Sequence, residues 1–192
     1  KIRQLTEPYG SKAPNIYLLH GDLTDDQMNS LYNHSKVKAM ISFTKGEGFG
    51  RPLLEFTLSE KPVIASQCSG QVDFLKHAHP LVGDETEIHA SATDDFLLPG
   101  SKWFTVNYIY AANTLRDCVS NYKNYLKAAK RQAYHSKTEF SLDAMSKKFR
   151  QYIDTALEAV PQQVELKLPK LKKVNKTEQP KLKLPKLKKV ES

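Results

Sequence analysis

Three glycines at alternate positions, Gly46, Gly48 and Gly50, limit the folds that this chain can adopt. They follow the apolar run 37–43 and precede a helix-like segment with Pro52 in its first turn, where a missing N–H costs nothing. A third short apolar run, 62–66, follows that helix directly. Strand, glycine-rich loop, helix and strand in this order predict a parallel α/β sheet, which binds ligands at the carboxyl ends of its strands.

The rest of the first 160 residues continues the alternation. Residues 15–20 are apolar and bounded by Pro14 and Gly21, so they predict a buried strand. Thr24 and Gln27 have the spacing of a capping box, which predicts a helix start. Further segments are expected as a helix with Leu53, Leu54 and Leu58 buried, a turn at 72–76, strands near 80–83 and 86–90, and helices at 107–137 and 141–160. The predicted fold is α/β, a Rossmann-like, doubly wound parallel sheet flanked by helices.

The charge of the chain is concentrated in its last 32 residues. Ten lysines and three glutamates there carry +7 of the formal net charge of +8, so residues 1–160 are nearly neutral. The nine residues 166–174 recur as 182–190, each copy with a proline that opposes a helix. We therefore expect a domain at 1–160 and a flexible, disordered basic tail at 161–192. A globally basic nucleic-acid-binding domain is not supported, while attachment of the tail to anionic lipid headgroups or to nucleic acid stays open.

Several other classes of site are disfavoured by spacing. Cys68 and Cys118 form neither a metal motif nor a disulfide framework, and free thiols favour a cytoplasmic location. The six histidines have no i, i+4 pair on one helix, and His77 and His79 are expected in a loop as surface or packing residues. The acidic pairs at 25–26 and 94–95 are read as helix caps and loop acids. Trp103 is expected as a buried anchor or part of a closing loop, and no apolar run is long enough to span a membrane.

Two carboxylates bracket the glycine-rich loop, Glu47 within it and Glu55 one turn into the following helix. Free N–H groups at a helix start after glycines favour a bound phosphate. Carboxylates repel phosphate but accept hydrogen bonds from hydroxyls. The combination predicts a diphosphate with a sugar on one side and a ribose on the other, which is a nucleotide sugar.

These residues resemble a known family. Glu47 and Glu55, with seven residues between them, form an E-x7-E motif. The segment 46–55 that contains it, followed by the segment 61–66, closely resembles the donor site of GT-B retaining glycosyltransferases of the family-4, or group 1, type. The segments 18–23, 69–75 and 140–145 resemble other parts of that lobe, so the similarity extends over residues 10–157. The resemblance implies the C-terminal half of a GT-B fold, without the N-terminal acceptor lobe and without the Arg and Lys that bind the diphosphate upstream.

The resemblance also implies roles at particular positions. Glu47 would contact the hexose and support positive charge on it, and Glu55 would bind the ribose hydroxyls. The remaining donor-binding residues are the loop amides and a base pocket: Gly48, Phe49, Gly50, Arg51, His20, Gly21 and Leu23. For Arg51 a solvent-facing or structural role is an equal alternative to a phosphate contact. Such enzymes use no cofactor and no metal ion.

We therefore expect a metal-independent hexosyltransferase that uses a UDP- or GDP-hexose and a glycan, lipid or protein acceptor. This chain would supply the donor lobe, incomplete as a catalyst by itself, in a cytoplasmic protein that is peripheral to the membrane if the tail attaches it. One alternative is a non-catalytic nucleotide-sugar-binding subunit or regulator. Another is a retaining glycoside hydrolase with Glu47 and Glu55 as its carboxylate pair, against which the phosphate-type loop argues.

Overall fold

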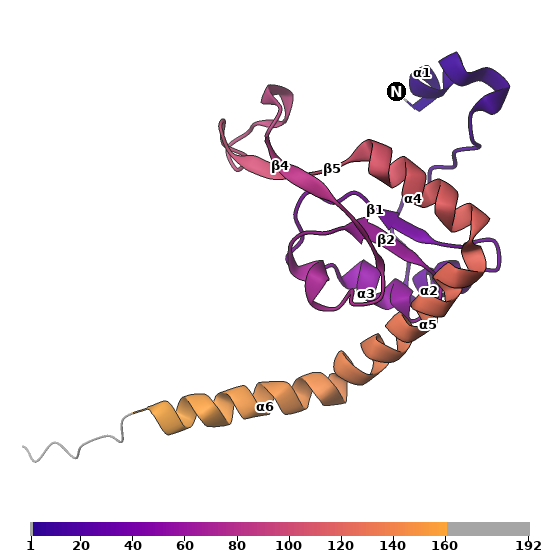
Figure 1. The fold of residues 1–192 in the computed structure, drawn as a ribbon. Helices are drawn as coiled ribbons and strands as arrows, with labels where there is room; N and C mark the ends of the chain where they lie inside the picture. The colour runs from indigo at the N-terminus through magenta and orange to yellow at the C-terminus, as the bar shows by residue number, and fades with distance from the viewer. Residues whose placement is uncertain (1, 161–192) are drawn as a thin grey trace, which may run out of the picture. The chain divides into compact units, whose positions relative to one another are not determined.

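The computed structural model describes residues 2–160, so the predicted tail, 161–192, lies outside the described residues. The chain divides into two compact units, residues 1–151 and 152–192, with the division inside the last helix. The strands within residues 2–160 all lie in the first unit (Figure 1). The described elements are, in order, α1 Ile2–Thr6, η1 Glu7–Lys12, α2 Asp25–Asn33, β1 Met40–Ser42, α3 Arg51–Thr57, β2 Val63–Ser66, η2 Gly70–Asp73, β3 His79–Leu81, β4 Gly83–Glu87, η3 Ala90–Ala92, β5 Lys102–Val106, α4 Tyr108–Ser120, α5 Tyr122–Glu139 and α6 Leu142–Ala159.

The main sheet has the order β1-β2-β3 with all pairs parallel, which confirms the predicted α/β class. In register, Ile41 lies opposite Ile64 and Ala65 opposite Pro80. The segments around 80–83 and 86–90 are strands, as predicted, although shifted to β3 and β4. The prediction did not include the pairing of β4 with β5, which form an antiparallel hairpin directly after the parallel sheet.

The central strand β2 is buried on both faces, and its alternating side chains build two cores. Val63 and Ala65 pack with α3 in one core, while Ile64 packs with residues of β3, β5, α4 and α5 in the other. Successive strand residues point to opposite faces, which explains the division. Figure 1 shows α2 and α3 on one side of the sheet and α4 on the other. Helices on both faces are the arrangement predicted from the strand–helix alternation.

The predicted capping box is present at the start of α2. The side chain of Thr24 accepts a hydrogen bond from the backbone of Gln27, whose side chain accepts one from the Thr24 backbone N–H. Lys61 secures the other end of this helix, because its Nζ donates to the carbonyl oxygens of Tyr32 at 2.6 Å and His34 at 2.8 Å. A cation on the last carbonyls also complements the helix dipole. These contacts hold α2 beside the start of β2.

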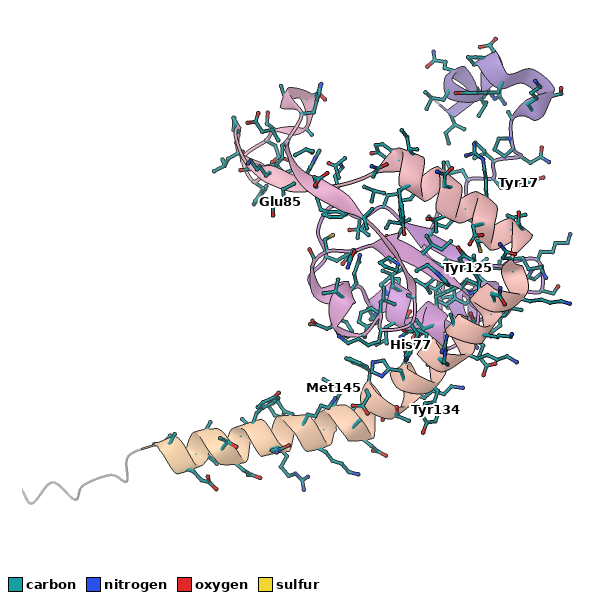
Figure 2. All side chains as sticks on the ribbon, in the orientation of Figure 1. Tyr17, His77, Glu85, Tyr125, Tyr134 and Met145 are labelled. Carbon is teal, nitrogen blue, oxygen red and sulfur yellow. The ribbon has the colours of Figure 1, made fainter. Side chains whose placement is uncertain are left out.

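The prediction of a buried strand at 15–20 is wrong. The segment has no regular secondary structure, and its apolar side chains are exposed, Tyr17 by 83% and Leu18 by 78% (Figure 2). A strand requires a neighbour for its backbone hydrogen bonds, and no strand within residues 2–160 pairs with this segment. Apolar composition predicted the strand tendency but could not supply that neighbour.

Three smaller expectations also need correction. Leu58 is 46% exposed and Leu54 half-buried, so only Leu53 of the predicted apolar set is fully buried. His79 lies in β3 rather than in a loop. The helix expected at 107–137 is two helices that meet at Asn121, whose Nδ2 donates to Asp117 Oδ1 at 2.6 Å. Asn competes for local hydrogen bonds and so favours such a break.

The last helix, α6, begins as predicted, with the Ser141 hydroxyl accepting a hydrogen bond from the Ala144 N–H at 3.2 Å. It contains no buried residue. Its exposed apolar side chains recur at helical spacing: Leu142, Met145, Phe149, Tyr152, Ile153 and Leu157. This helix is therefore amphipathic, with its apolar stripe uncovered.

Candidate nucleotide-sugar site

The glycine-rich loop joins the carboxyl end of β1 to the start of α3. Gly50, immediately before α3, adopts the left-handed conformation with φ 86° and ψ 43°. A side chain at this position would be strained, and its Cβ would also lie 3.3 Å from the Cβ of Gln71. Gly50 is therefore fixed both by its backbone angles and by the buried residue beneath it.

A second glycine, Gly70 after β2, holds this loop in place. Its N–H donates to the Glu47 carbonyl oxygen at 3.1 Å. A Cβ on Gly70 would lie 2.0 Å from the Gly48 carbonyl oxygen, so no side chain fits here. By contrast, a Cβ on Gly48 would meet nothing within 4 Å. One side of the loop is thus pressed against the turn after β2, while the backbone at Gly48 is open to an approaching ligand.

The structure also shows how Phe49 is anchored. Its ring packs 5.0 Å from the ring of Phe74 and 6.3 Å from that of Phe140, which are 5.9 Å from each other. Phe140 lies between α5 and α6, so this aromatic trio ties the loop to the helices of the C-terminal part of the first unit. Sequence reasoning used only the backbone of Phe49 and missed the ring as an anchor; three aromatic residues far apart in sequence give no local signal.

The two carboxylates have different surroundings. Glu55 forms an i, i+4 ion pair with Arg51, with Nε to Oε1 at 3.1 Å and the Arg51 side chain 78% exposed. The Glu47 side chain is exposed in the loop, and within residues 2–160 it has neither a hydrogen-bond nor an ion-pair partner. Glu47 is thus free to accept hydrogen bonds from a ligand, whereas Glu55 already holds one cation.

Glu55 lines a hollow of about 430 Å³ between α2 and α3. Leu23 and Arg51 line it too, together with residues of both helices. His20 and Gly21 are not among its lining residues, although Leu23 follows them closely in the chain. The structure therefore brings Leu23, Arg51 and Glu55 together and places the other two predicted base-pocket residues elsewhere on the exposed segment.

Residues 12–94 match the family model described as glycosyl transferases group 1, and the stretch contains the loop, both carboxylates and Gly70. Residues 12–94 are therefore similar to the group 1 glycosyl transferases. The predicted resemblance is confirmed there, whereas its extension to residue 157 lies beyond the matched stretch. No curated protein matches the chain.

The hairpin of β4 and β5 adjoins the glycine-rich loop. The Phe104 N–H donates to the Lys45 carbonyl oxygen at 3.3 Å, and the Lys45 ammonium lies 4.1 Å from the centre of the Trp103 ring. Trp103 is half-buried in β5, so it is neither the predicted closing loop nor a fully buried anchor. A lone Trp in a polar stretch gave no signal that it would lie beside the glycine-rich loop.

The other candidate residues have structural explanations. Cys68 and Cys118 are free thiols, and burial raises the pKa of both. Asp94 accepts hydrogen bonds from the N–H groups of Leu97 and Phe96, which lower its pKa, so it is a loop acid as predicted. His79 is half-buried and stacks on Tyr125. In the described part of the chain, no group of three or more metal-binding side chains comes together and no helix could cross a membrane.

Proposed function

We propose that this chain is the donor-binding lobe of an enzyme that transfers a hexose from a nucleoside diphosphate to an acceptor hydroxyl, with retention of configuration. The observation that carries the proposal is the loop Glu47–Gly50. Gly70 and the Phe49 anchor hold it at the carboxyl edge of a parallel sheet, with its open side beside an unpaired carboxylate. Edges of this kind are where open α/β sheets bind nucleotides.

In this proposal the backbone N–H groups of Gly48, Phe49 and Gly50 bind the diphosphate and sugar. The open space beside Gly48 supports this role, because a ligand can approach the main chain closely there. Glu47 accepts hydrogen bonds from the hexose hydroxyls and stabilises positive charge that develops on the sugar when the bond to the diphosphate breaks. Donors held rigidly around the departing diphosphate would lower the barrier through electrostatic stabilisation, without a metal ion or cofactor.

Glu55 would accept hydrogen bonds from the ribose hydroxyls in the hollow between α2 and α3. The ion pair with Arg51 supports this role because it orients the Glu55 carboxylate. Arg51 itself would act by positioning Glu55. It would contact the diphosphate only after its side chain rotates away from Glu55. Leu23 would provide an apolar contact for the base, with His20 and Gly21 reaching the base once the 15–24 segment closes over it.

The proposed donor is a UDP- or GDP-hexose, and the acceptor is a glycan, lipid or protein bound chiefly by an N-terminal lobe of the full-length protein. We place the enzyme in the cytoplasm, which its two free cysteines support. The Lys-rich tail would attach it to an anionic membrane surface. The alternative function, a nucleotide-sugar-binding subunit without catalysis, uses the same site, and only hexose transfer by the full-length protein separates the two.

The function is tested by calorimetric titration of the chain with UDP, GDP, ADP and their hexose conjugates. One of these nucleotides is expected to bind saturably, and Glu55→Ala is expected to weaken it about tenfold, the loss of one charge-assisted hydrogen-bonding group. Glu60→Ala is the matched control, because Glu60 is exposed just beyond α3 and outside the hollow. Equal affinity in the wild type and Glu55→Ala, or no binding of any nucleotide, would contradict the proposed site.

A further inference from the structure

Two segments leave the same edge of the sheet and meet there. Parallel strands share the direction of their carboxyl ends, so the loop after β1 and the hairpin after β3 both begin at this edge. Only one residue separates β3 from β4. Gly83 makes the tight entry possible, because a Cβ there would lie 2.1 Å from the Thr105 carbonyl oxygen. The hairpin is therefore fixed next to the glycine-rich loop.

Lys45 connects the two segments. Its carbonyl oxygen accepts the hydrogen bond from the β5 backbone, and its ammonium group lies over the face of Trp103. A cation on an indole ring is stabilised electrostatically by only about 0.5–1 kcal/mol near the surface. The ring thus positions the ammonium loosely and leaves its charge uncompensated.

The two cations that flank the loop differ in this respect. Arg51 is paired with Glu55, while no carboxylate lies within ion-pair distance of Lys45 in the described residues. Lys45 precedes Gly48 by three residues, which span at most about 10 Å of extended chain. Its four-carbon stem is flexible, so an anion on the loop amides lies within its reach.

We propose that Lys45 binds the diphosphate of the donor, and that Trp103 holds its ammonium group when no donor is bound. The inference rests on the proposed function and adds to it a cation supplied by the loop itself. Binding would move the ammonium from the ring to the phosphate oxygens, because a charge-assisted hydrogen bond is stronger than the cation–π contact. Trp103 would then report occupancy of the site, since it is the chain's single tryptophan.

The test follows Trp103 fluorescence and calorimetric affinity together while the full chain is titrated with UDP, GDP and ADP. Lys45→Met keeps the length of the side chain without its charge, and Lys45→Arg keeps the charge. Lys102→Met is the matched control, because Lys102 is adjacent to Trp103 but points to the opposite face of the hairpin. Circular dichroism establishes that each variant is folded.

We expect Lys45→Met to weaken nucleotide binding about tenfold and to abolish the fluorescence change, while Lys45→Arg and Lys102→Met retain both. Unchanged affinity in Lys45→Met, or a fluorescence change of full amplitude, would overturn the role of Lys45 and leave the donor site intact. If the wild-type chain binds none of the three nucleotides, this role and the proposed function are overturned together.

Discussion

The close contact of Gly70 with the Gly48 backbone determines the shape of the proposed donor loop. Gly70 allows the turn after β2 to touch the Gly48 carbonyl, and Ser69 beside it adopts a positive φ of 57°, unusual for a residue with a side chain. Strain of this kind persists only where the surroundings impose it. The turn at 69–70 is therefore as much a part of the site as the E-x7-E motif.

Gly70→Ala tests this contact. We expect it to push the loop away from β2, to cost about 1–3 kcal/mol of stability through overpacking, and to weaken nucleotide binding at least tenfold. Gly46→Ala is the control, because its Cβ would lie at an ordinary 3.8 Å from Ser69 Oγ. Urea unfolding and calorimetry measure the two effects. Wild-type affinity in Gly70→Ala would show that the contact does not shape the site.

A second residue-scale feature is the stack of the half-buried His79 on the buried Tyr125, with ring centres 3.8 Å apart. Burial lowers the pKa of His79, and the nearby Asp117 opposes this only in part. Burial and the hydrogen bond to Asp117 raise the pKa of the Tyr125 hydroxyl. The fold therefore holds His79 in its neutral form.

This arrangement predicts a pH dependence of stability. Because the folded pKa of His79 lies below the unfolded value of about 6.5, the unfolded chain binds the proton more readily. The stabilisation is complete above the unfolded pKa and is lost as the pH falls below it, by at most about 1.4 kcal/mol per pH unit for one proton. Urea unfolding between pH 7.5 and about 5 should give a shallower pH dependence for His79→Gln than for the wild type. Parallel curves of unfolding free energy against pH for the two proteins would contradict this role of His79.

At the scale of elements, a buried polar network connects α5 with α3 and with the segment that follows η2. Gln132 donates to the Phe74 carbonyl oxygen at 2.7 Å and accepts from the His77 N–H at 2.7 Å (His77 is labelled in Figure 2). Ser136 on the same helix accepts a hydrogen bond from Thr57 of α3 at 2.8 Å. Phe74 also belongs to the aromatic trio that anchors Phe49. The network thus connects α5 with the donor loop.

Gln132→Met should destabilise the protein by about 2–4 kcal/mol, because it leaves the buried Phe74 carbonyl and the partly buried His77 N–H without hydrogen-bond partners. The exposed Gln67→Met is the comparison and should change stability by no more than about 0.5 kcal/mol. Urea denaturation of both variants measures the difference. Equal stability of the two would mean that water replaces the lost partners.

Local signals predicted some elements well and others badly. The capping box at Thr24 and the apolar run of β2 need only neighbouring residues, and both are present in the structure. The strand expected at 15–20 failed because pairing depends on a distant partner. The β4–β5 hairpin was missed because β5 and its antiparallel pairing with β4 depend on cross-strand contacts between segments that are not adjacent in the sequence.

The contrast between local signals and contacts with distant residues also applies to the candidate site. The glycines and carboxylates around Glu47 could be found from the sequence because their spacing within one segment carries the chemistry. Gly70, Phe140 and Trp103 reach the loop only through the fold, from elements that follow it by tens of residues. Sequence reasoning identified the loop, and the structure identified what holds it.

At the scale of the whole molecule, charge separates a nearly neutral body from a basic tail, which lies outside the described residues. Each lysine near an anionic leaflet contributes about 1 kcal/mol, so ten lysines suffice for attachment at low salt. We expect the full chain to bind phosphatidylserine vesicles in a salt-sensitive manner and a variant ending at residue 160 to bind much less, as measured by co-sedimentation. Neutral phosphatidylcholine vesicles are the control. Equal binding of both chains would exclude the tail as the attachment.

The central claim is that the backbone of the glycine-rich loop binds the diphosphate of a nucleotide sugar. Heteronuclear NMR of the labelled chain, titrated with UDP and with GDP, observes those amides directly. We expect saturable chemical-shift changes centred on Gly48, Phe49 and Gly50 and extending to Glu55 and Gly70. Changes confined to other parts of the molecule, or none at these amides with either nucleotide, would contradict it.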